Sequence, residues 1–220
     1  MKKIVISVGG SLINPGKLDL HFLKELKSII KSIEHKYKIV LVTGGGYLAR
    51  EYMQVFKRKK EKSLIGIQCT QLNARLLSLY LKNTEEISVT LNELKSKLPK
   101  EKLLICGGLK EQINTTSDGT SAKIAKIIKA DLFINMTNVS GLYTKDPRQY
   151  KDAKLIPRIS HKDFRILINK HNEKPGQHFV LDQQAAKITF KKNIPVVIIK
   201  GTKELKKVLL EKKFKGTIIS

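Results

Sequence analysis

The sequence contains no tryptophan, only two cysteines and few aromatic residues, and each shortage argues against a class of protein. Aromatic residues make up 6% of the chain, which is a poor supply of the stacking surfaces used by RNA-binding modules. Cys69 and Cys106 lie in apolar stretches without metal-ligand spacing. We therefore expect buried free thiols in a reducing compartment rather than a metal centre or a disulfide framework.

Long hydrophobic runs are also missing. No apolar stretch approaches the length of about 18 residues that a membrane helix needs, so no membrane span is predicted. The N-terminus has two lysines, but the apolar run that follows is short and ends at Gly9. This pattern indicates a first core strand rather than a signal peptide. We expect a cytoplasmic protein with no membrane partner.

Acidic residues are scarce. The chain has 19 Asp and Glu against 43 Lys and Arg, which gives a formal net charge of +24. Such a balance suits nucleic acid or a polyanionic substrate. The lysines are spread over most predicted helices rather than gathered in one arm, and the densest run, 57–60, is typical of a solvated helix end. The charge favours an anionic ligand without naming one.

Several familiar motifs are absent as well. The chain has no Gly-x-x-x-x-Gly-Lys-Ser/Thr loop and no Gly-x-Gly-x-x-Gly fingerprint, which argues against a P-loop kinase and a classical dinucleotide site. It also lacks His-Glu-x-x-His, paired Cys-x-x-Cys and Gly-x-Ser-x-Gly. Glycine turns, cations and one well-placed carboxylate remain. That inventory fits phosphoryl transfer, which depends on positioning and charge neutralisation.

The most informative stretch spans residues 38–52. An apolar, β-branched run over 39–42 precedes three glycines at 44–46, and a segment with helical spacing follows. We interpret this as a buried strand, a tight turn and a helix. Glycine lets the backbone approach a ligand closely, and N–H groups at a helix start attract anions. Arg50, one turn further on, could add a planar cation. An ordinary strand-to-helix turn is the alternative.

Strands alternate with helices along most of the chain. This predicts an α/β fold, a three-layer αβα sandwich with a largely parallel central sheet. Glycine turns also follow the strands before Gly9-Gly10 and Gly107-Gly108. Because the carboxyl ends of parallel strands share one edge, we expect all three turns to converge on one crevice. The strands are expected at 4–8, 39–42, 87–89, 103–106, 132–136, 195–199 and 216–219. A long helix is expected over 64–81, with Ile65, Leu72, Leu76 and Leu79 on its inner face.

These motifs occur in the order and spacing of a known family. The chain resembles the amino acid kinase superfamily, and within it most closely the archaeal type of uridylate (UMP) kinase. The resemblance runs essentially from end to end, and it implies a single kinase domain over residues 1–220. In that domain residues 1–130 form roughly the acceptor side and 131–220 the ATP side. The matching stretches are Val8-Gly9-Gly10-Ser11, 44–50, Ile65-Gly66-Ile67-Gln68, Gly107-Gly108, Thr115-Thr116-Ser117-Asp118, 130–132, 137–147 and 180–187.

The resemblance implies transfer of a phosphoryl group from ATP to UMP, with Mg²⁺ held by the phosphates rather than by side chains, in a homohexamer. Asp118 falls where the superfamily places a carboxylate that organises neighbouring cations, and Lys187 is the second implied catalytic residue. ATP contacts are implied at Gly9, Gly10, Gly46, Arg50, Thr137, Asn138, Tyr143 and Asp146. UMP contacts are implied at Gly45, Ser63, Gly108, Asn114, Thr115 and Thr116.

From the residues alone, plainer roles stay open. Asp118 could cap its helix, Asp146-Pro147 is an ordinary turn pair, and Thr115 and Thr116 could be solvated loop. The chain also departs from the family at Ser7, where many members carry a lysine that neutralises the transferred phosphoryl group. Mg²⁺ or another cation must then supply that charge, and Lys187, Arg50 and Lys110 are the candidates.

The acceptor side departs further. Ser63 stands where close relatives often carry an Asp that binds the ribose of UMP, and the loop over 109–114 lacks the usual Pro-Gly pair. Two alternatives therefore remain. One is a sister kinase of the same fold that phosphorylates another small phosphate or carboxylate. The other is a nucleic-acid-binding or regulatory protein on a kinase scaffold. The charge suggests this alternative, and the shortage of aromatic residues argues against it.

Overall fold

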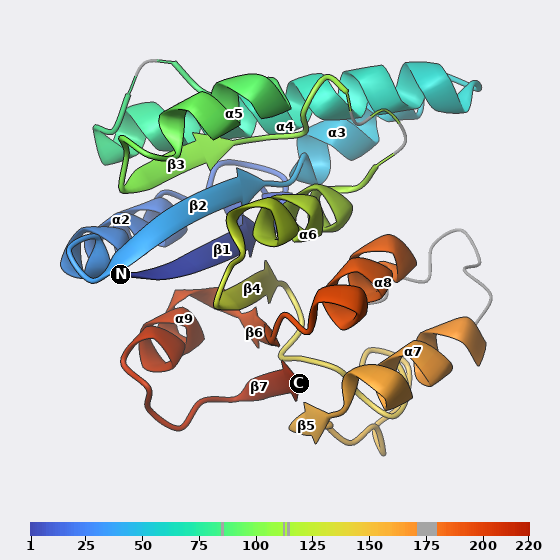
Figure 1. Cartoon of the computed structure of the whole chain (residues 1–220). Coiled ribbons are helices and arrows are strands. Elements are labelled where there is room, and N and C mark those ends of the chain that lie inside the picture. The colour runs from blue at the N-terminus through green and yellow to red at the C-terminus, as the bar shows by residue number, and fades with distance from the viewer. Residues whose placement is uncertain (85, 112, 114, 171–179) are drawn as a thin grey trace.

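The computed structural model describes residues 1–84, 86–111, 113, 115–170 and 180–220. Its centre is a seven-stranded sheet with the order β3-β2-β1-β4-β6-β7-β5 (Figure 1). All neighbouring strands run parallel except β6 and β7, so the prediction of a largely parallel sheet is confirmed. The strands are β1 (Lys2–Val8), β2 (Tyr37–Thr43), β3 (Leu103–Cys106), β4 (Leu132–Thr137), β5 (Arg158–Ile159), β6 (Val196–Lys200) and β7 (Gly216–Ile219).

Helices cover both faces of this sheet, which confirms the three-layer arrangement (Figure 1). One layer contains α2 (Leu20–Ile33), α4 (Lys59–Leu81) and α9 (Gly201–Leu209). The other contains α5 (Leu91–Lys97), α6 (Ser117–Ile128), α7 (His161–Lys170) and α8 (Gln183–Lys192). Two short helices, α1 (Gly10–Ile13) and α3 (Gly46–Met53), begin just beyond β1 and β2.

The alternation of side chains along β1 assigns its residues to two hydrophobic cores. Ile4, Ile6 and Val8 enter the core under α2, whereas Val5 enters the core under α6. Ser7 has the same parity as Val5 and therefore faces the α6 layer. This places a polar side chain of the central strand on the side of the sheet where α6 begins.

The predicted inner face of α4 is confirmed only in part. Leu76 packs against the core, but Leu72 and Leu79 are 58% and 52% exposed. The face of α4 that packs on the sheet instead carries apolar Ala74 and Leu77, together with buried polar residues such as Asn73. Because the buried face of α4 carries several polar residues, the apolar residues with helical spacing do not mark that face. The prediction therefore included leucines that lie on the outer face.

Smaller differences concern short elements. The strand expected over 87–89 is reduced to one isolated parallel bridge between Ser88 and Cys106. Strand β5 was not predicted, because two residues are too short for a hydrophobic pattern. Both cysteines are buried free thiols, as expected. Across the described residues, no helix is long and apolar enough to cross a membrane.

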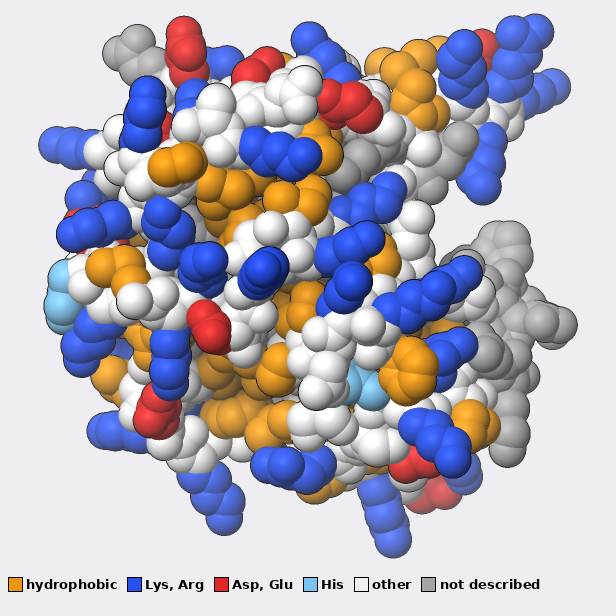
Figure 2. All heavy atoms as spheres, viewed as in Figure 1, with side chains coloured by type: hydrophobic (Ala, Val, Ile, Leu, Met, Phe, Trp, Pro, Cys, Tyr) orange, Lys and Arg blue, Asp and Glu red, His pale blue; other side chains and the backbone are white. Residues whose placement is uncertain are grey.

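Positive charge is spread widely over the surface. In Figure 2 lysine and arginine side chains are scattered across the visible face among few acidic ones. Hydrophobic side chains lie between them rather than in a separate region of that face. On this face the distribution matches the scattered lysines of the sequence and its formal net charge of +24.

Candidate active site

The glycine turns after β1 and β2 pack directly against each other. A Cβ atom on Gly10 would lie 2.1 Å from the amide nitrogen of Gly46 and 2.5 Å from the carbonyl oxygen of Gly44. Gly46 also has a φ angle of +67°, which residues with a side chain rarely adopt. Backbone contact alone therefore requires glycine at these positions, whether or not a ligand binds.

Some N–H groups of these turns are used within the protein and others are not. Gly9 donates to the carbonyl of Met136 and Gly44 donates to that of Val8, both at 2.9 Å. Within the described residues, the N–H groups of Gly10 and Gly46 have no acceptor. Gly46 begins α3, where unsatisfied N–H groups and the helix dipole favour an anion.

Helix α4 holds the turn after β2 through one buried side chain. Asn73 donates from Nδ2 to the carbonyl oxygens of Gly44 at 2.8 Å and Gly45 at 3.3 Å. Its side chain is only 4% exposed, so these bonds are made away from competing water. Asn73 therefore fixes which way the turn presents its peptide groups.

The turn after β3 docks on the same helix. The N–H of Gly108 donates to Thr70 Oγ1 at 2.7 Å, and its carbonyl accepts from Gln71 Nε2 at 2.9 Å. A Cβ on Gly107 would lie 2.6 Å from the backbone of α4. All three glycine turns thus follow parallel strands at one edge of the sheet, as predicted, and α4 holds both the second and the third of them.

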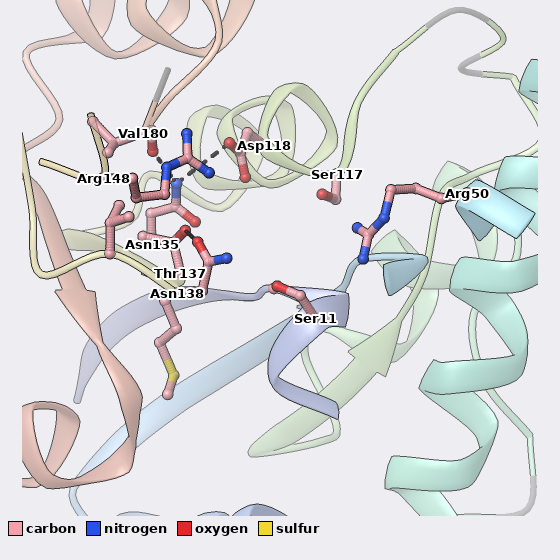
Figure 3. Close-up of a pocket in the computed structure, with 12 residues that line it drawn as sticks. Ser11, Arg50, Ser117, Asp118, Asn135, Thr137, Asn138, Arg148 and Val180 are labelled. Carbon is pink, nitrogen blue, oxygen red and sulfur yellow. Dashed lines mark hydrogen bonds between the residues drawn. The ribbon is translucent and has the colours of Figure 1, made fainter. Parts of the chain in front are cut away.

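A cavity of about 390 Å³ opens at the carboxyl ends of β1 and β4 (Figure 3). It draws on both halves of the chain: the turn after β1, α3, the start of α6, the end of β4 and the loop that follows β4. Its lining is formed by Gly9, Ser11, Arg50, Ser117, Asp118, Asn135, Met136, Thr137, Asn138, Val139, Arg148 and Val180.

Asp118 is the only carboxylate among the described residues that line this cavity. Its Oδ1 accepts from Ser7 Oγ at 3.1 Å, and its Oδ2 accepts from Asn135 Nδ2 at 3.3 Å. Ser7 and Asn135 are register partners on the neighbouring strands β1 and β4. Asn135 donates a further bond to the carbonyl of Val180 at 2.7 Å. Adjacent strands thus fix the carboxylate with one donor for each oxygen.

Asp118 is not the cap of its helix, so that plainer interpretation is wrong. Thr116 caps α6, because its Oγ1 accepts from the N–H of Gly119 at 3.0 Å. The Thr116 hydroxyl also donates to Asp182, which caps α8 in the same way. With the capping position filled, the side chain of Asp118 is left to face the sheet and the cavity.

The electrostatics of Asp118 follow from these surroundings. Burial, as the largest cause, and the nearby negative charge of Asp182 together raise its pKa to about 7. The hydrogen bonds from Ser7 and Asn135 oppose this rise, because they stabilise the ionised form. Near neutral pH the carboxyl group therefore exists in both protonation states.

Two arginines are the only cations among the described lining residues. Arg50 comes from α3 and Arg148 from the loop after β4, and Figure 3 shows them on opposite sides of Asp118 and Ser117. Arg148 pairs with Asp146, whose carboxylate oxygens accept from its Nε at 3.1 Å and its Nη2 at 3.0 Å. The cavity thus presents positive charge from both halves of the chain.

The predicted site residues divide into three groups. Gly9, Arg50, Asp118, Thr137 and Asn138 line the cavity. Gly10, Gly45 and Gly46 form the adjoining turns. The remaining described residues lie outside the lining, and Asn114 lies outside the described residues. Those outside the lining are Tyr143, which bridges Leu155; Asp146, which holds Arg148; Ser63 on α4; Gly108; Thr115, which accepts from Lys123; Thr116; and the exposed Lys187 on α8.

Four polar or charged lining residues were not predicted as site residues: Ser11 and Ser117, which lie within stretches that carry the family resemblance, and Asn135 and Arg148. Asn135 is the one polar residue inside the apolar run 132–136, and a buried polar side chain in a central strand is a signal that could have identified it. Arg148 follows the Asp146-Pro147 turn, and nothing in the local pattern distinguishes it from the many other cations of the chain.

The donors around the cavity suit a chain of phosphate oxygens. Two guanidinium groups, the Ser11 and Ser117 hydroxyls and the free N–H groups of the glycine turns can all donate hydrogen bonds. In the part of the chain that the structure describes, no three His, Cys, Asp or Glu side chains cluster to hold a metal ion. The chemistry of the cavity is that of anion binding.

Comparison with known proteins agrees with this geometry. The uridylate kinase of Pyrococcus abyssi is 32% identical over 99% of both chains, and that of Methanocorpusculum labreanum is 35% identical over 100% of this chain and 96% of its own. The crystal structure of uridylate kinase from Archaeoglobus fulgidus matches over 100% of both chains with 30% identity and a TM-score of 0.87. Residues 2–200 match the model of the amino acid kinase family, and the chain therefore belongs to that family.

Proposed function

We propose that the protein is an ATP-dependent uridylate kinase, which transfers the γ-phosphoryl group of ATP to UMP and forms ADP and UDP. One observation carries the proposal: a cavity with a single fixed carboxylate lies between two arginines and beside glycine turns with free N–H groups. It occurs in a chain that aligns over nearly its whole length with proteins named uridylate kinase.

The residues of this chain would act by positioning. The free N–H groups of Gly10 and Gly46, together with Arg50, would hold phosphate oxygens as negative charge shifts during transfer. Asp118 in its ionised form would orient neighbouring cations through its charge. A phosphate acceptor is already largely ionised at neutral pH, so Asp118 need not remove a proton from it.

Mg²⁺ would add charge neutralisation at the phosphates when it enters with ATP. The protein offers it few ligands, because Asp118 is the only carboxylate among the described lining residues. Phosphate oxygens and water would therefore complete its coordination, which agrees with the reluctance of Mg²⁺ to lose water.

The UMP contacts remain proposals that follow from the family resemblance. They are placed at Gly45, Ser63, Gly108, Thr115 and Thr116, on the side of the glycine turns nearest α4 and the start of α6. Both backbone groups of Gly108 already bond to α4. Its role there would be to shape the pocket and not to donate a hydrogen bond.

We also propose that the protein self-associates, as the homohexamer of the resemblance implies. Helices α3 and α4 and the turn between them expose Tyr52, Val55, Leu64, Leu72 and Leu79. Exposed apolar side chains gathered on adjacent helices are typical of protein interfaces. The occupant would be a second copy of this chain.

The test is a panel of nucleoside monophosphates incubated with ATP and Mg²⁺, with products separated by chromatography. We expect UDP from UMP at a rate that exceeds the other acceptors by at least about tenfold, which corresponds to about 1.4 kcal/mol of discrimination. If another nucleoside monophosphate is phosphorylated in place of UMP, that acceptor would be the substrate and the assignment of UMP would be wrong. Inactivity on every acceptor would overturn the proposal.

A further inference from the structure

Because Ser7 stands where many members of the superfamily carry a lysine, the site lacks the positive charge that this lysine would supply. Ser7 donates a neutral hydrogen bond to Asp118 and brings no positive charge. Among the candidates considered from the sequence, Lys187 and Lys110 do not line the cavity, and Arg50 approaches only from the α3 side. Among the described lining residues, the positive charge on the other side is carried by the loop after β4.

Arg148 is the lining cation on that side. It lies two residues beyond Asp146 in a loop that leaves β4 at Thr137, and in Figure 3 its guanidinium group points into the cavity opposite Arg50. Thr137 and Asn138, which begin the same loop, also line the cavity. The loop therefore brings two polar side chains and one cation to a single wall.

Asp146 holds this arginine in place by three bonds. It accepts from the backbone N–H of Arg148 at 3.0 Å, from Nε at 3.1 Å and from Nη2 at 3.0 Å. These bonds lower the pKa of Asp146 and raise the pKa of Arg148, so both groups stay charged at neutral pH. The planar fork of arginine leaves its remaining guanidinium N–H groups for another partner.

The side chain of Asp146 is thus committed to a neighbour in its own loop. Its Oδ1 takes two of the three bonds and its Oδ2 takes the third. Asp146 is not a lining residue of the cavity, whereas Arg148 is. The geometry is that of a carboxylate that orients a guanidinium group, and not that of a carboxylate turned toward a ligand.

We propose that Arg148 binds the phosphate chain of the nucleotide donor from the wall opposite Arg50, and that Asp146 is a positioning residue that acts through Arg148. This inference rests on the proposed function for the identity of the donor as ATP. It assigns to Arg148 the positive charge that Ser7 does not provide.

Calorimetric titration of the full-length protein with ATP, ADP and adenosine tests the contact without any need for turnover. Arg148→Gln should weaken the binding of ATP and ADP by about 10- to 100-fold, the effect of losing a charge-assisted hydrogen bond, and leave adenosine binding unchanged. Arg148→Lys should retain part of the affinity, because it keeps the charge and loses the fork.

Lys145→Gln is the matched control. Lys145 lies in the same loop and is also paired with a carboxylate, that of Asp152, but it does not line the cavity. Its replacement removes the same charge and should change ATP affinity less than about twofold, since exposed charges are screened. An equal loss in both variants would mean that net charge alone is sensed. That result would overturn the contact, as would unchanged ATP binding or an equal loss for adenosine in Arg148→Gln.

The role of Asp146 is tested by a double-mutant cycle with the same titration. Asp146→Asn should weaken ATP binding in the natural protein and have no further effect in the Arg148→Gln background. An additional loss in that background, or weaker binding of adenosine, would show that Asp146 contacts the nucleoside directly. The acceptor panel reads the proposed function independently, so a protein that binds ATP through Arg148 yet leaves UMP unmodified would refute only that function.

Discussion

At the scale of single residues, the carboxyl group of Asp118 is held by two neutral donors in a place where burial and Asp182 oppose its ionisation. A proposed positioning role depends on the ionised form, because only a charge orients cations over a distance. The balance between these effects leaves the group half-titrated in the neutral range.

Turnover should therefore depend on pH through Asp118. Because burial raises its pKa to about 7, the ionised form is lost as pH falls through that value, and kcat should fall with it. Asp118→Asn should lower kcat far more than it lowers ATP affinity, and it should remove this acid limb. Rate measurements from pH 5.5 to about 8.5 check both points. If kcat of the Asp118→Asn variant still falls at the same acidic pH, the fall must be caused by the titration of another group.

A second residue-scale expectation concerns Gly10. Gly10→Ala should reduce the free energy of unfolding by about 3 kcal/mol or more, since its Cβ would overlap backbone atoms that cannot move aside. Gly66→Ala is the matched control, because its Cβ would meet only the flexible Met53 side chain at 3.2 Å inside a helix. That change should be neutral or slightly stabilising. Urea unfolding measures the free energy of unfolding of both variants. Equal losses of stability in the two variants would contradict the argument that the backbone packs against Gly10.

At the scale of elements, α4 has two distinct faces. Its inner face carries Thr70, Gln71 and Asn73, which bond to the glycine turns after β2 and β3. Its outer face exposes Leu72 and Leu79. One helix therefore holds the turns beside the cavity and carries exposed apolar side chains on its opposite face.

Asn73→Leu should show what the inner face contributes. Loss of its bond to Gly44 leaves that buried carbonyl unpaired and should cost about 1–3 kcal/mol of stability, whereas the carbonyl of Gly45 still accepts from the N–H of Ala49. Because the turn then relaxes, the KM for UMP should also rise. Ser78→Ala removes a buried bond of the same helix, to the carbonyl of Thr84, and should reduce stability alone. A KM that shifts equally in both variants would contradict a local role of Asn73.

The elements that the sequence predicts correctly are those with strong local signals. Apolar, β-branched runs located β1, β2, β3, β4, β6 and β7. The face of α4 could not be predicted, because its buried positions are chosen for hydrogen bonds to turns distant in the sequence. Asn135 and Arg148 were missed for a related reason, since each gains its role only from partners that the fold supplies.

At the scale of the whole molecule, residues distant in the sequence meet in one cavity. Arg50 belongs to the first quarter of the chain, Asp118 to its middle and Arg148 to the last third. The central sheet makes this meeting possible, because β1 and β4 lie side by side although more than a hundred residues separate them. The site is therefore a property of the complete sheet and of neither half alone.

Self-association gives a test at this scale. Leu72→Glu places a charge on the exposed apolar face of α4 and should shift the protein to smaller assemblies, because burying an unpaired charge at an interface is costly. Leu210→Glu is the control, because Leu210 is an exposed leucine (44%) at the C-cap of α9, away from α4. Light scattering after gel filtration measures both. A natural protein that is already monomeric, or a Leu72→Glu variant of unchanged mass, would count against the interface.

Because Ser7 pairs with Asn135 across β1 and β4, catalytic activity should depend on the correct register of these two strands. If β1 and β4 paired one residue out of register, the side chains of Ser7 and Asn135 would no longer lie together beside Asp118. An apolar residue that neighbours one of them in its strand would lie there instead. Misfolded molecules could then retain their secondary structure yet do no chemistry. The specific activity of a refolded sample would therefore measure the fraction of molecules in which β1 and β4 pair in the correct register. Circular dichroism would not detect molecules with the wrong register.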